Sequence, residues 1–253
     1  MLTTERKALI LDRLGKEGRV IAKEFSQKLN VSEDTIRRDL RELASEGLLQ
    51  RVHGGALPAS RALADLPTRR RVSVEDKSAI AKAAAAMVKK GQIVFLDGGT
   101  TAVAVARALP LDLQATVVTH SPDVAVALLD HPAVEIELIG GRIYKHSNVS
   151  TGAVAMESIA RIHAEIYFMG VTGIHPDHGL TTGDREEAAI KRSISRQSAE
   201  TIVLASSEKL GAVSAYHVVD LDQVDGLIVE KNCRADLVEP IKKRGIAVTR
   251  AAG

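Results

Sequence analysis

Apolar residues in the first part of the chain recur at the spacing of amphipathic helices. Residues 4–14 and 22–29 each repeat apolar side chains at helical intervals, and residues 31–43 continue the pattern. Residues 48–57 differ, because two short segments flank Gly54-Gly55, a pair typical of the turn in a β-hairpin. The pattern therefore predicts three helices followed by a basic hairpin, which is the arrangement of a winged helix-turn-helix.

The third predicted helix, over residues 31–43, has a marked start and two different faces. Ser32 suits its N-cap, because the hydroxyl can accept a hydrogen bond from a free amide of the first turn. Ile36, Leu40 and Leu43 lie at i, i+4 and i+7, so we expect them to be buried together. The outer face carries the remaining polar and basic side chains, namely Thr35, Arg37, Arg38 and Arg41.

An exposed helix with arginines is the kind of element that the DNA major groove accepts, and a hairpin beside it can contact the backbone. The same residues also fit an ordinary solvated helix, since Asp39 and Glu42 lie beside the arginines. The local pattern leaves both interpretations open. The neighbouring helices and hairpin favour DNA, and we predict a DNA-binding surface made of Ser32, Thr35, Arg37, Arg38, Arg41, Arg51 and His53.

Residues 58–74 show neither helical nor alternating periodicity, which indicates a linker. The arginines at 69–71 fit a solvated spacer or a contact with the DNA backbone. We therefore expect a winged helix-turn-helix domain over residues 1–57, a linker over 58–74 and a second domain over 75–253.

The second domain alternates short apolar strands with helices. Its strands lack in–out alternation, which is typical of strands buried on both faces of a mainly parallel sheet in an α/β domain. We expect strands at 92–96, 115–119, 134–139, 166–170, 201–205 and 226–229. We expect helices at 76–90, 102–109, 122–129, 153–162, 185–198 and 234–244.

Asp97-Gly98-Gly99-Thr100-Thr101 lies between a predicted strand and a predicted helix. Glycines let backbone amides approach an anion, the hydroxyls add donors, and the start of a helix favours negative charge. The alternative is an ordinary glycine turn with threonine caps. The loop is neither a Walker loop, since the lysine is absent, nor a dinucleotide fingerprint, since the third glycine is absent.

Further polar residues follow other predicted strands, where ligands bind in open parallel sheets. Each one alone fits a loop residue, but together they indicate a small polar pocket. The predicted pocket consists of Asp97, Gly98, Gly99, Thr100, Thr101, His120, Gly140, Gly141, Arg142, Lys145, Glu187, Lys191 and Lys209.

The charge distribution and the cysteine content indicate where DNA would bind and which kinds of site are absent. The net charge is only +2, but residues 1–71 hold 15 Lys and Arg against 10 Asp and Glu, which places the basic excess at the predicted DNA-binding end. Cys233 is the single cysteine, so the sequence predicts no disulfide framework and no cysteine-based metal site. The absence of a long apolar run and of a signal peptide predicts a cytoplasmic protein.

The chain resembles the DeoR family of bacterial transcriptional repressors over nearly its whole length. The N-terminal match covers Val31-Ser32, residues 35–40, Leu43 and residues 51–56. The C-terminal match comprises Arg71, Lys77, residues 97–101, Gly140-Gly141, Gly170, Gly173, residues 179–181, Glu187, Ala188, Lys191, Lys209 and Gly211. The resemblance implies a sensor domain with the fold of ribose-5-phosphate isomerase that binds phosphorylated sugars, with the 98–101 loop around the phosphate and Lys191 helping to bind it.

The chain departs from the family pattern at several positions. His120 stands where relatives usually have Asn, Glu165 where Asp is common, Ser206 where Asp is usual, and Gly152-Ala153 where Gly-Pro is usual. Because these positions line or border the predicted pocket, the resemblance does not identify the effector.

We therefore predict a repressor, not an enzyme, for a carbohydrate-catabolism operon. It would bind double-stranded operator DNA and a phosphorylated sugar effector, form a homodimer or homotetramer mainly through its C-terminal domain, and need no cofactor or metal. One alternative is a sugar-phosphate isomerase or transferase with Glu187 or Asp97 as general base and Lys191 as electrostatic stabiliser. Another is a nucleic-acid module whose second domain only oligomerises, which would leave the 98–101 loop without a role.

Overall fold

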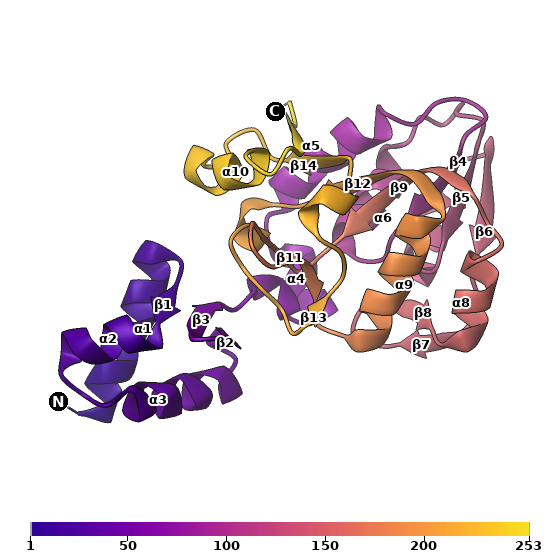
Figure 1. The fold of residues 1–253 in the computed structure, drawn as a ribbon. Coiled ribbons are helices and arrows are strands. Elements are labelled where there is room, and N and C mark those ends of the chain that lie inside the picture. The colour runs from indigo at the N-terminus through magenta and orange to yellow at the C-terminus, as the bar shows by residue number, and fades with distance from the viewer. Residues whose placement is uncertain (1, 253) are drawn as a thin grey trace.

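The structure is a computed structural model that describes residues 2–252, so Met1 and Gly253 of the expected domains lie outside it. Its N-terminal part consists of three helices and a small antiparallel sheet (Figure 1). The helices are α1 (Thr3–Glu17), α2 (Ala22–Leu29) and α3 (Glu33–Ser45). The sheet has the order β1-β3-β2 and contains β1 (Val20–Ile21), β2 (Leu49–Val52) and β3 (Gly55–Pro58). The predicted winged helix-turn-helix is thereby confirmed.

Helix α3 begins and packs as its sequence predicts, with one exception. Ser32 caps it by accepting a hydrogen bond from the Thr35 amide at 3.2 Å, and its apolar residues enter the small core. Asp39, which we expected beside the outer arginines, is buried instead. Its carboxylate accepts hydrogen bonds from Nε and Nη2 of Arg6, the latter at 2.9 Å, so a buried ion pair joins α1 to α3.

The hairpin differs from the prediction at its turn. Val52 pairs with Gly55, so the turn is His53-Gly54 rather than Gly54-Gly55. Gly54 supplies the left-handed conformation, with φ of 77°. A third strand, β1, was not predicted, because two residues are too few to show an alternating pattern.

The segment after the hairpin is more ordered than its sequence pattern indicates. It contains a short 3-10 turn, η1 (Arg61–Leu63), and a helix, α4 (Leu66–Arg71). Asp65 caps α4 by accepting a hydrogen bond from the Thr68 amide at 3.0 Å. A helix of six residues is too short to show periodicity, so only the Asp65 cap and the proline after it could have indicated it.

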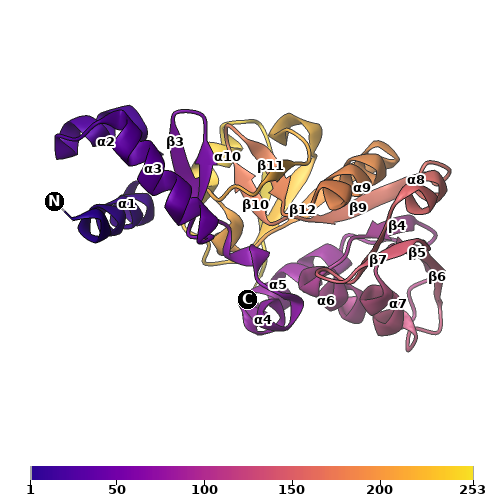
Figure 2. The ribbon, with the colours of Figure 1, turned by 90° about the horizontal axis from the view of Figure 1, so that it is seen from below.

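The C-terminal part is built around a seven-stranded parallel sheet with the order β15-β14-β12-β9-β4-β5-β6 (Figures 1 and 2). Its strands are β4 (Ile93–Leu96), β5 (Ala115–Thr119), β6 (Val134–Leu138), β9 (Ala164–Gly170), β12 (Ser198–Leu204), β14 (Gly226–Val229) and β15 (Ala247–Arg250). The edge strand β15 was not predicted. The predicted α/β class with a mainly parallel sheet is confirmed.

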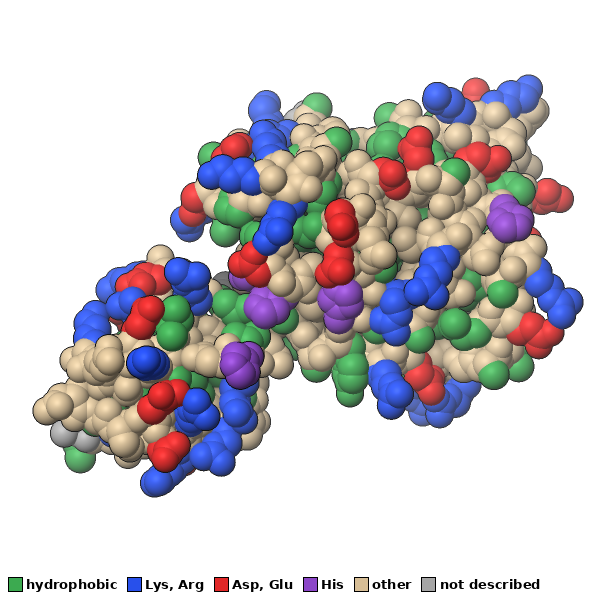
Figure 3. Space-filling view, viewed as in Figure 1, with side chains coloured by type: hydrophobic (Ala, Val, Ile, Leu, Met, Phe, Trp, Pro, Cys, Tyr) green, Lys and Arg blue, Asp and Glu red, His purple; other side chains and the backbone are tan. Residues whose placement is uncertain are grey.

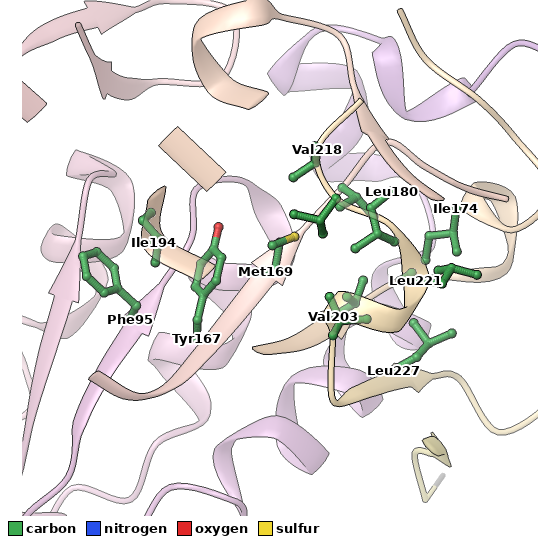
Figure 4. Packing of buried hydrophobic residues seen from close by; sticks show 14 of the residues in the cluster. Phe95, Tyr167, Met169, Ile174, Leu180, Ile194, Val203, Val218, Leu221 and Leu227 are labelled. Atoms are coloured by element: carbon green, nitrogen blue, oxygen red, sulfur yellow. The ribbon is translucent and has the colours of Figure 1, made fainter. Parts of the chain in front are cut away.

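Helices cover both faces of this sheet. One layer contains α5 (Val74–Ala85), α6 (Thr100–Ala108) and α7 (Pro122–Leu128); the other contains α8 (Ala153–Ile159), α9 (Arg185–Arg196) and α10 (Ala235–Lys242). Successive strand residues enter opposite layers: Phe95 packs with α9 in the cluster of Figure 4, whereas Val94 and Leu96 pack with α5 and α6. Burial on both faces explains why the strands lack alternating polarity.

Two small antiparallel sheets lie beyond the ends of the main strands, in segments that we expected to be loops. One pairs β7 (Arg142–Tyr144) with β8 (Val149–Thr151). The other joins β10 (Gly173–His175), β11 (Gly179–Thr182) and β13 (Tyr216–His217). Two short 3-10 turns, η2 (Ser207–Lys209) and η3 (Leu221–Gln223), complete the fold.

The strand order determines where a ligand site can form. From β4 the chain moves outward through β5 to β6, and then returns to the other side of β4 to place β9, β12, β14 and β15. The direction of winding therefore reverses between β4 and β9. In open parallel sheets, ligands bind in the crevice at the carboxyl ends of the strands at such a point.

Candidate functional site

A cavity of about 270 Å³ opens at the carboxyl ends of β4, β9 and β12, at the reversal point of the sheet. Its floor is formed by the loop Gly98–Thr101 after β4 and by residues 170–172 after β9. Glu187 and Lys191 reach it from α9, and Glu208 and Lys209 from the turn after β12. The remaining lining residues include Ala62, Leu63, Arg69, Val72, Lys77, Tyr144, His146, Ser147, Thr182 and Gly183.

The loop Gly98–Thr101 has the geometry of an anion-binding turn. Gly99 has φ of 98° and forms the N-cap of α6, which begins at Thr100. A Cβ atom on Gly98 would collide with the side chain of Val149, so only glycine fits there without a shift of its neighbours. The first amides of a helix have no partners within the helix, and their positive partial charge favours an anion in front of them.

Asp97 lies beneath this loop and is fully buried. Its carboxylate accepts hydrogen bonds from the Lys191 ammonium, from His120 Nε2 at 3.0 Å, and from the amides of Gly98 and Gly170 at 2.8 and 2.7 Å. Burial raises the pKa of Asp97, but the charge of Lys191 and the contact with His120 outweigh it and hold that pKa below its ordinary value. Asp97 is therefore an ionised support for the loop, and it is poorly suited to take up a proton.

Positive side chains are crowded around the cavity. Arg69, Lys77, Lys191 and Lys209 all line it. Burial lowers the pKa of Lys209 to about 8, and the nearby cations Lys77, Arg69 and Lys191 act in the same direction, against Glu208. Lys77 Nζ is already engaged, because it donates to the carbonyls of Arg69 and Val72, both at 2.6 Å. An anion in the cavity would offset the repulsion between these charges.

The structure brings together most, but not all, of the predicted pocket. The residues that line the cavity are Gly98, Gly99, Thr100, Thr101, Glu187, Lys191 and Lys209. Asp97 and His120 lie buried behind it, where His120 also contacts the Ser150 carbonyl at 3.1 Å.

Four predicted pocket residues lie elsewhere. Gly140, Gly141, Arg142 and Lys145 are not part of the described cavity wall, although Tyr144, His146 and Ser147 of the same connection after β6 line it. Arg142 instead forms an exposed ion pair with Glu186 at 2.7 Å. The sequence does not show which residues of this connection reach the cavity, because it does not reveal how the β7–β8 hairpin folds.

Other lining residues were missed by the prediction. Arg69 belongs to the segment interpreted as an irregular linker, and its signal was the run of arginines at 69–71. Tyr144, His146 and Ser147 come from the β7–β8 hairpin, which we expected to be a loop. For Tyr144 and Ser147 the local sequence offers no signal, whereas His146 is one of the polar residues in the loop beyond a predicted strand.

Basic side chains also gather on the N-terminal part, along the side that carries α3 and the β2–β3 hairpin (Figure 3). Arg37, Arg38 and Arg41 are exposed on α3, and Thr35 is half-buried at its first turn. Arg37 forms an ion pair with Glu33 at 2.7 Å. Ser32 and the hairpin residues Arg51 and His53 are also exposed. All seven predicted DNA-binding residues thus lie on α3, at its cap or on the hairpin.

Within residues 2–252, no helix combines the length and apolarity required to cross a membrane. In the same range, no group of three or more His, Cys, Asp or Glu side chains is arranged to hold a metal ion.

The chain matches two family descriptions and several characterised proteins. Residues 6–62 match the DeoR-like helix-turn-helix domain, and residues 72–231 match the DeoR C terminal sensor domain. The chain is 33% identical to the HTH-type transcriptional regulator GlpR of Haloferax volcanii over 98% of both chains. It is 31% identical to the HTH-type transcriptional repressor GlcR of Bacillus subtilis, over 97% of this chain and 95% of that one. Ribose 5-phosphate isomerase A from Methanocaldococcus jannaschii superposes with a TM-score of 0.39 and 17% identity, over 53% of this chain and 52% of the other.

Proposed function

Because the chain belongs to the DeoR family of transcriptional regulators, we propose that it represses a carbohydrate-catabolism operon and that a phosphorylated sugar controls its affinity for DNA. The proposal that a phosphorylated sugar binds rests on the cavity at the reversal point of the sheet, where an anion-binding turn faces a cluster of cations. The proposal places the protein in the cytoplasm, together with the DNA that it binds.

At the DNA end, we propose that α3 enters the major groove and that the hairpin contacts the backbone or minor groove. The proposed contact residues are Ser32, Thr35, Arg37, Arg38, Arg41, Arg51 and His53. The two faces of α3 support this proposal, because its apolar residues fill the core while its arginines stay exposed. An exposed basic helix beside a wing can provide both base contacts and phosphate contacts.

At the effector end, we propose that the amides and hydroxyls of Gly98–Thr101 hold the phosphoryl group. Lys191 and Lys209 would supply positive charge, and Glu187 would accept hydrogen bonds from sugar hydroxyls. Of the two lysines, Lys209 gives the clearer test of phosphate binding when it is substituted. No ion pair or hydrogen bond holds its ammonium to another described residue, whereas the Lys191 ammonium also neutralises the buried Asp97.

A thermal-shift screen tests the proposal. The panel contains glycerol 3-phosphate, hexose 1- and 6-phosphates, ribose 5-phosphate and the corresponding unphosphorylated sugars. A compound that binds the native state raises the Tm by mass action, so we expect phosphorylated members to raise it and their unphosphorylated partners to leave it unchanged.

Two variants test whether the active compound binds in this cavity. Lys209→Met should abolish the stabilisation by the active compound, whereas Lys243→Met, at the end of α10 and outside the cavity, should retain it. If no phosphorylated compound raises the Tm, or if Lys209→Met responds like the wild type, the cavity is not the effector site.

The surroundings of Asp97 argue against Asp97 as the general base of the isomerase alternative. A general base must be able to take up a proton, but Asp97 already accepts four hydrogen bonds and its pKa is lowered. The matched relatives are regulators, not enzymes. The protein is therefore a regulator that has a sensor domain in place of an active site.

A further inference from the structure

We propose that Arg69 is a phosphate ligand, and that the effector thereby fastens the connecting segment, residues 59–73, to the sensor domain. The inference rests on the proposed function, because it assumes that the cavity takes a phosphorylated ligand. It adds a binding residue from outside the sheet and a physical path from the effector to the DNA-binding domain.

The connecting segment forms one wall of the cavity. Ala62, Leu63, Arg69 and Val72 all line it, opposite the loop Gly98–Thr101 and the helix α9. Leu63 lies directly against Gly183, where an added Cβ would approach the Leu63 methyl group to 2.5 Å. The ligand space is therefore incomplete without this segment.

Arg69 has the position and the free donors that a phosphate ligand needs. Its Nη2 donates to the His146 carbonyl at 2.9 Å, while its buried Nε has no hydrogen-bond partner among the described residues. A Cβ atom on Gly99 would lie 4.0 Å from Nη1, so the guanidinium group is beside the anion-binding turn. A guanidinium matches the geometry of phosphoryl oxygens and can donate two hydrogen bonds to them.

Without a ligand, the segment is held mainly by polar contacts. Among the six described residues of α4, none is buried. The anchors include a hydrogen bond from Ser60 Oγ to the Thr172 carbonyl, a bridge between Ala59 and Val213, and an exposed ion pair between Arg70 and Asp123. Lys77 Nζ of α5 also donates to the Arg69 and Val72 carbonyls, and Arg69 donates to the His146 carbonyl. Exposed ion pairs contribute little, and a helix this short is marginal alone. A strong contact from Arg69 to a bound phosphate would therefore change how firmly the segment is held.

The same segment holds the DNA-binding hairpin. Strand β3 ends at Pro58 and the chain continues without a break through Ala59 to α4, as Figures 1 and 2 show. Fastening α4 to the sensor domain restricts the positions that the hairpin and α3 can take. A ligand shifts such an equilibrium only by its difference in affinity for the two arrangements, and the Arg69 contact supplies that difference.

The test uses the full chain with inorganic phosphate as the probe, and sodium chloride at matched ionic strength as the reference. Hydrogen–deuterium exchange should slow in peptides that cover residues 98–103 and also in those that cover 62–73. Phosphate affinity, measured by calorimetry, should fall about tenfold or more in Arg69→Met, as expected for a lost hydrogen bond between charged groups. Arg71→Met, on the exposed face of the same helix, should bind phosphate like the wild type.

The outcomes separate the two proposals. Protection at 98–103 alone, with unchanged affinity in Arg69→Met, would overturn this inference and leave the proposed function intact. Absence of protection in both regions, with no phosphorylated sugar raising the Tm, would overturn the proposed function itself. If Arg69→Met does not fold, the exchange of residues 62–73 in the wild-type chain decides the question.

Discussion

Lys191 and Lys209 line the same cavity, but their ammonium groups have different surroundings. Lys191 is bonded to the buried carboxylate of Asp97, whereas Lys209 lies among other cations. Removing one partner of a buried ion pair leaves an uncompensated charge, which typically costs about 3–5 kcal/mol. Removing a buried unpaired ammonium relieves a desolvation penalty.

We therefore predict opposite effects of the two substitutions on stability. Lys191→Met should lower the free energy of unfolding by about 3–5 kcal/mol, while Lys209→Met should leave it unchanged or raise it. Chemical denaturation monitored by circular dichroism measures both. Equal destabilisation by the two variants would contradict the ion pair between Lys191 and Asp97, and the double variant Asp97→Asn with Lys191→Met should recover part of the loss.

The pKa of Lys209 predicts how the affinity for the effector depends on pH. Burial lowers its pKa to about 8, so the ammonium is charged below that pH and neutral above it. A bound phosphoryl group favours the charged form, so binding above pH 8 requires uptake of a proton. Calorimetry with the active phosphorylated compound should show that affinity falls by up to about tenfold between pH 7.5 and pH 9. The Lys209→Met variant should show a flatter profile, and a wild-type affinity that is constant over this range would contradict the prediction.

At the scale of elements, the hydrophobic pattern and the length of each element decided which helices and strands the sequence predicts. Helix α3 was predicted because its apolar residues repeat at helical spacing, and the central strands were predicted because they are short, nearly continuous apolar runs. Helix α4 and strand β1 have six and two residues, so no period could appear in them. The burial of Asp39 was missed for a different reason, because its partner Arg6 lies on another helix.

The exposed face of α3 predicts how individual arginines contribute to DNA binding. Arg37 is already paired with Glu33, whereas Arg38 has no ion pair with another described side chain. Arg38→Ala should therefore weaken operator binding more than Arg37→Ala. A lost base contact would cost about 1–3 kcal/mol on the operator only, whereas a lost phosphate contact would weaken all sequences and reduce the salt slope by about one.

Fluorescence anisotropy with operator and unrelated DNA, at several salt concentrations, distinguishes these cases. Lys243→Ala on the sensor domain is the control and should bind like the wild type. If removal of both Arg37 and Arg38 leaves operator affinity unchanged, α3 is not the helix that contacts DNA.

At the scale of the whole molecule, the position of the site follows from the order of the strands, which the sequence does not reveal. Residues after β4 line one cavity with residues of α9, because β4 lies at the reversal of the sheet. The connection after β6 folds into the β7–β8 hairpin, which brings Tyr144, His146 and Ser147 to the cavity and leaves Gly140 and Arg142 outside it. Arg69 lines the cavity only because the connecting segment folds back against the sheet.

One helix-turn-helix domain reads only a few base pairs. Useful specificity then requires at least two copies on related half-sites, which matches the symmetry of most such operators. We predict a homodimer or homotetramer formed mainly through the C-terminal domain, which leaves the N-terminal domains free to reach DNA. Light scattering should give a mass of twice or four times the 27.0 kDa of one chain. The variant with both Arg37 and Arg38 changed to Ala should keep this mass, since its altered surface lies on the DNA side. A monomer both in solution and on DNA would contradict the prediction, and a dimer that dissociates in this variant would place the interface on the N-terminal domain instead.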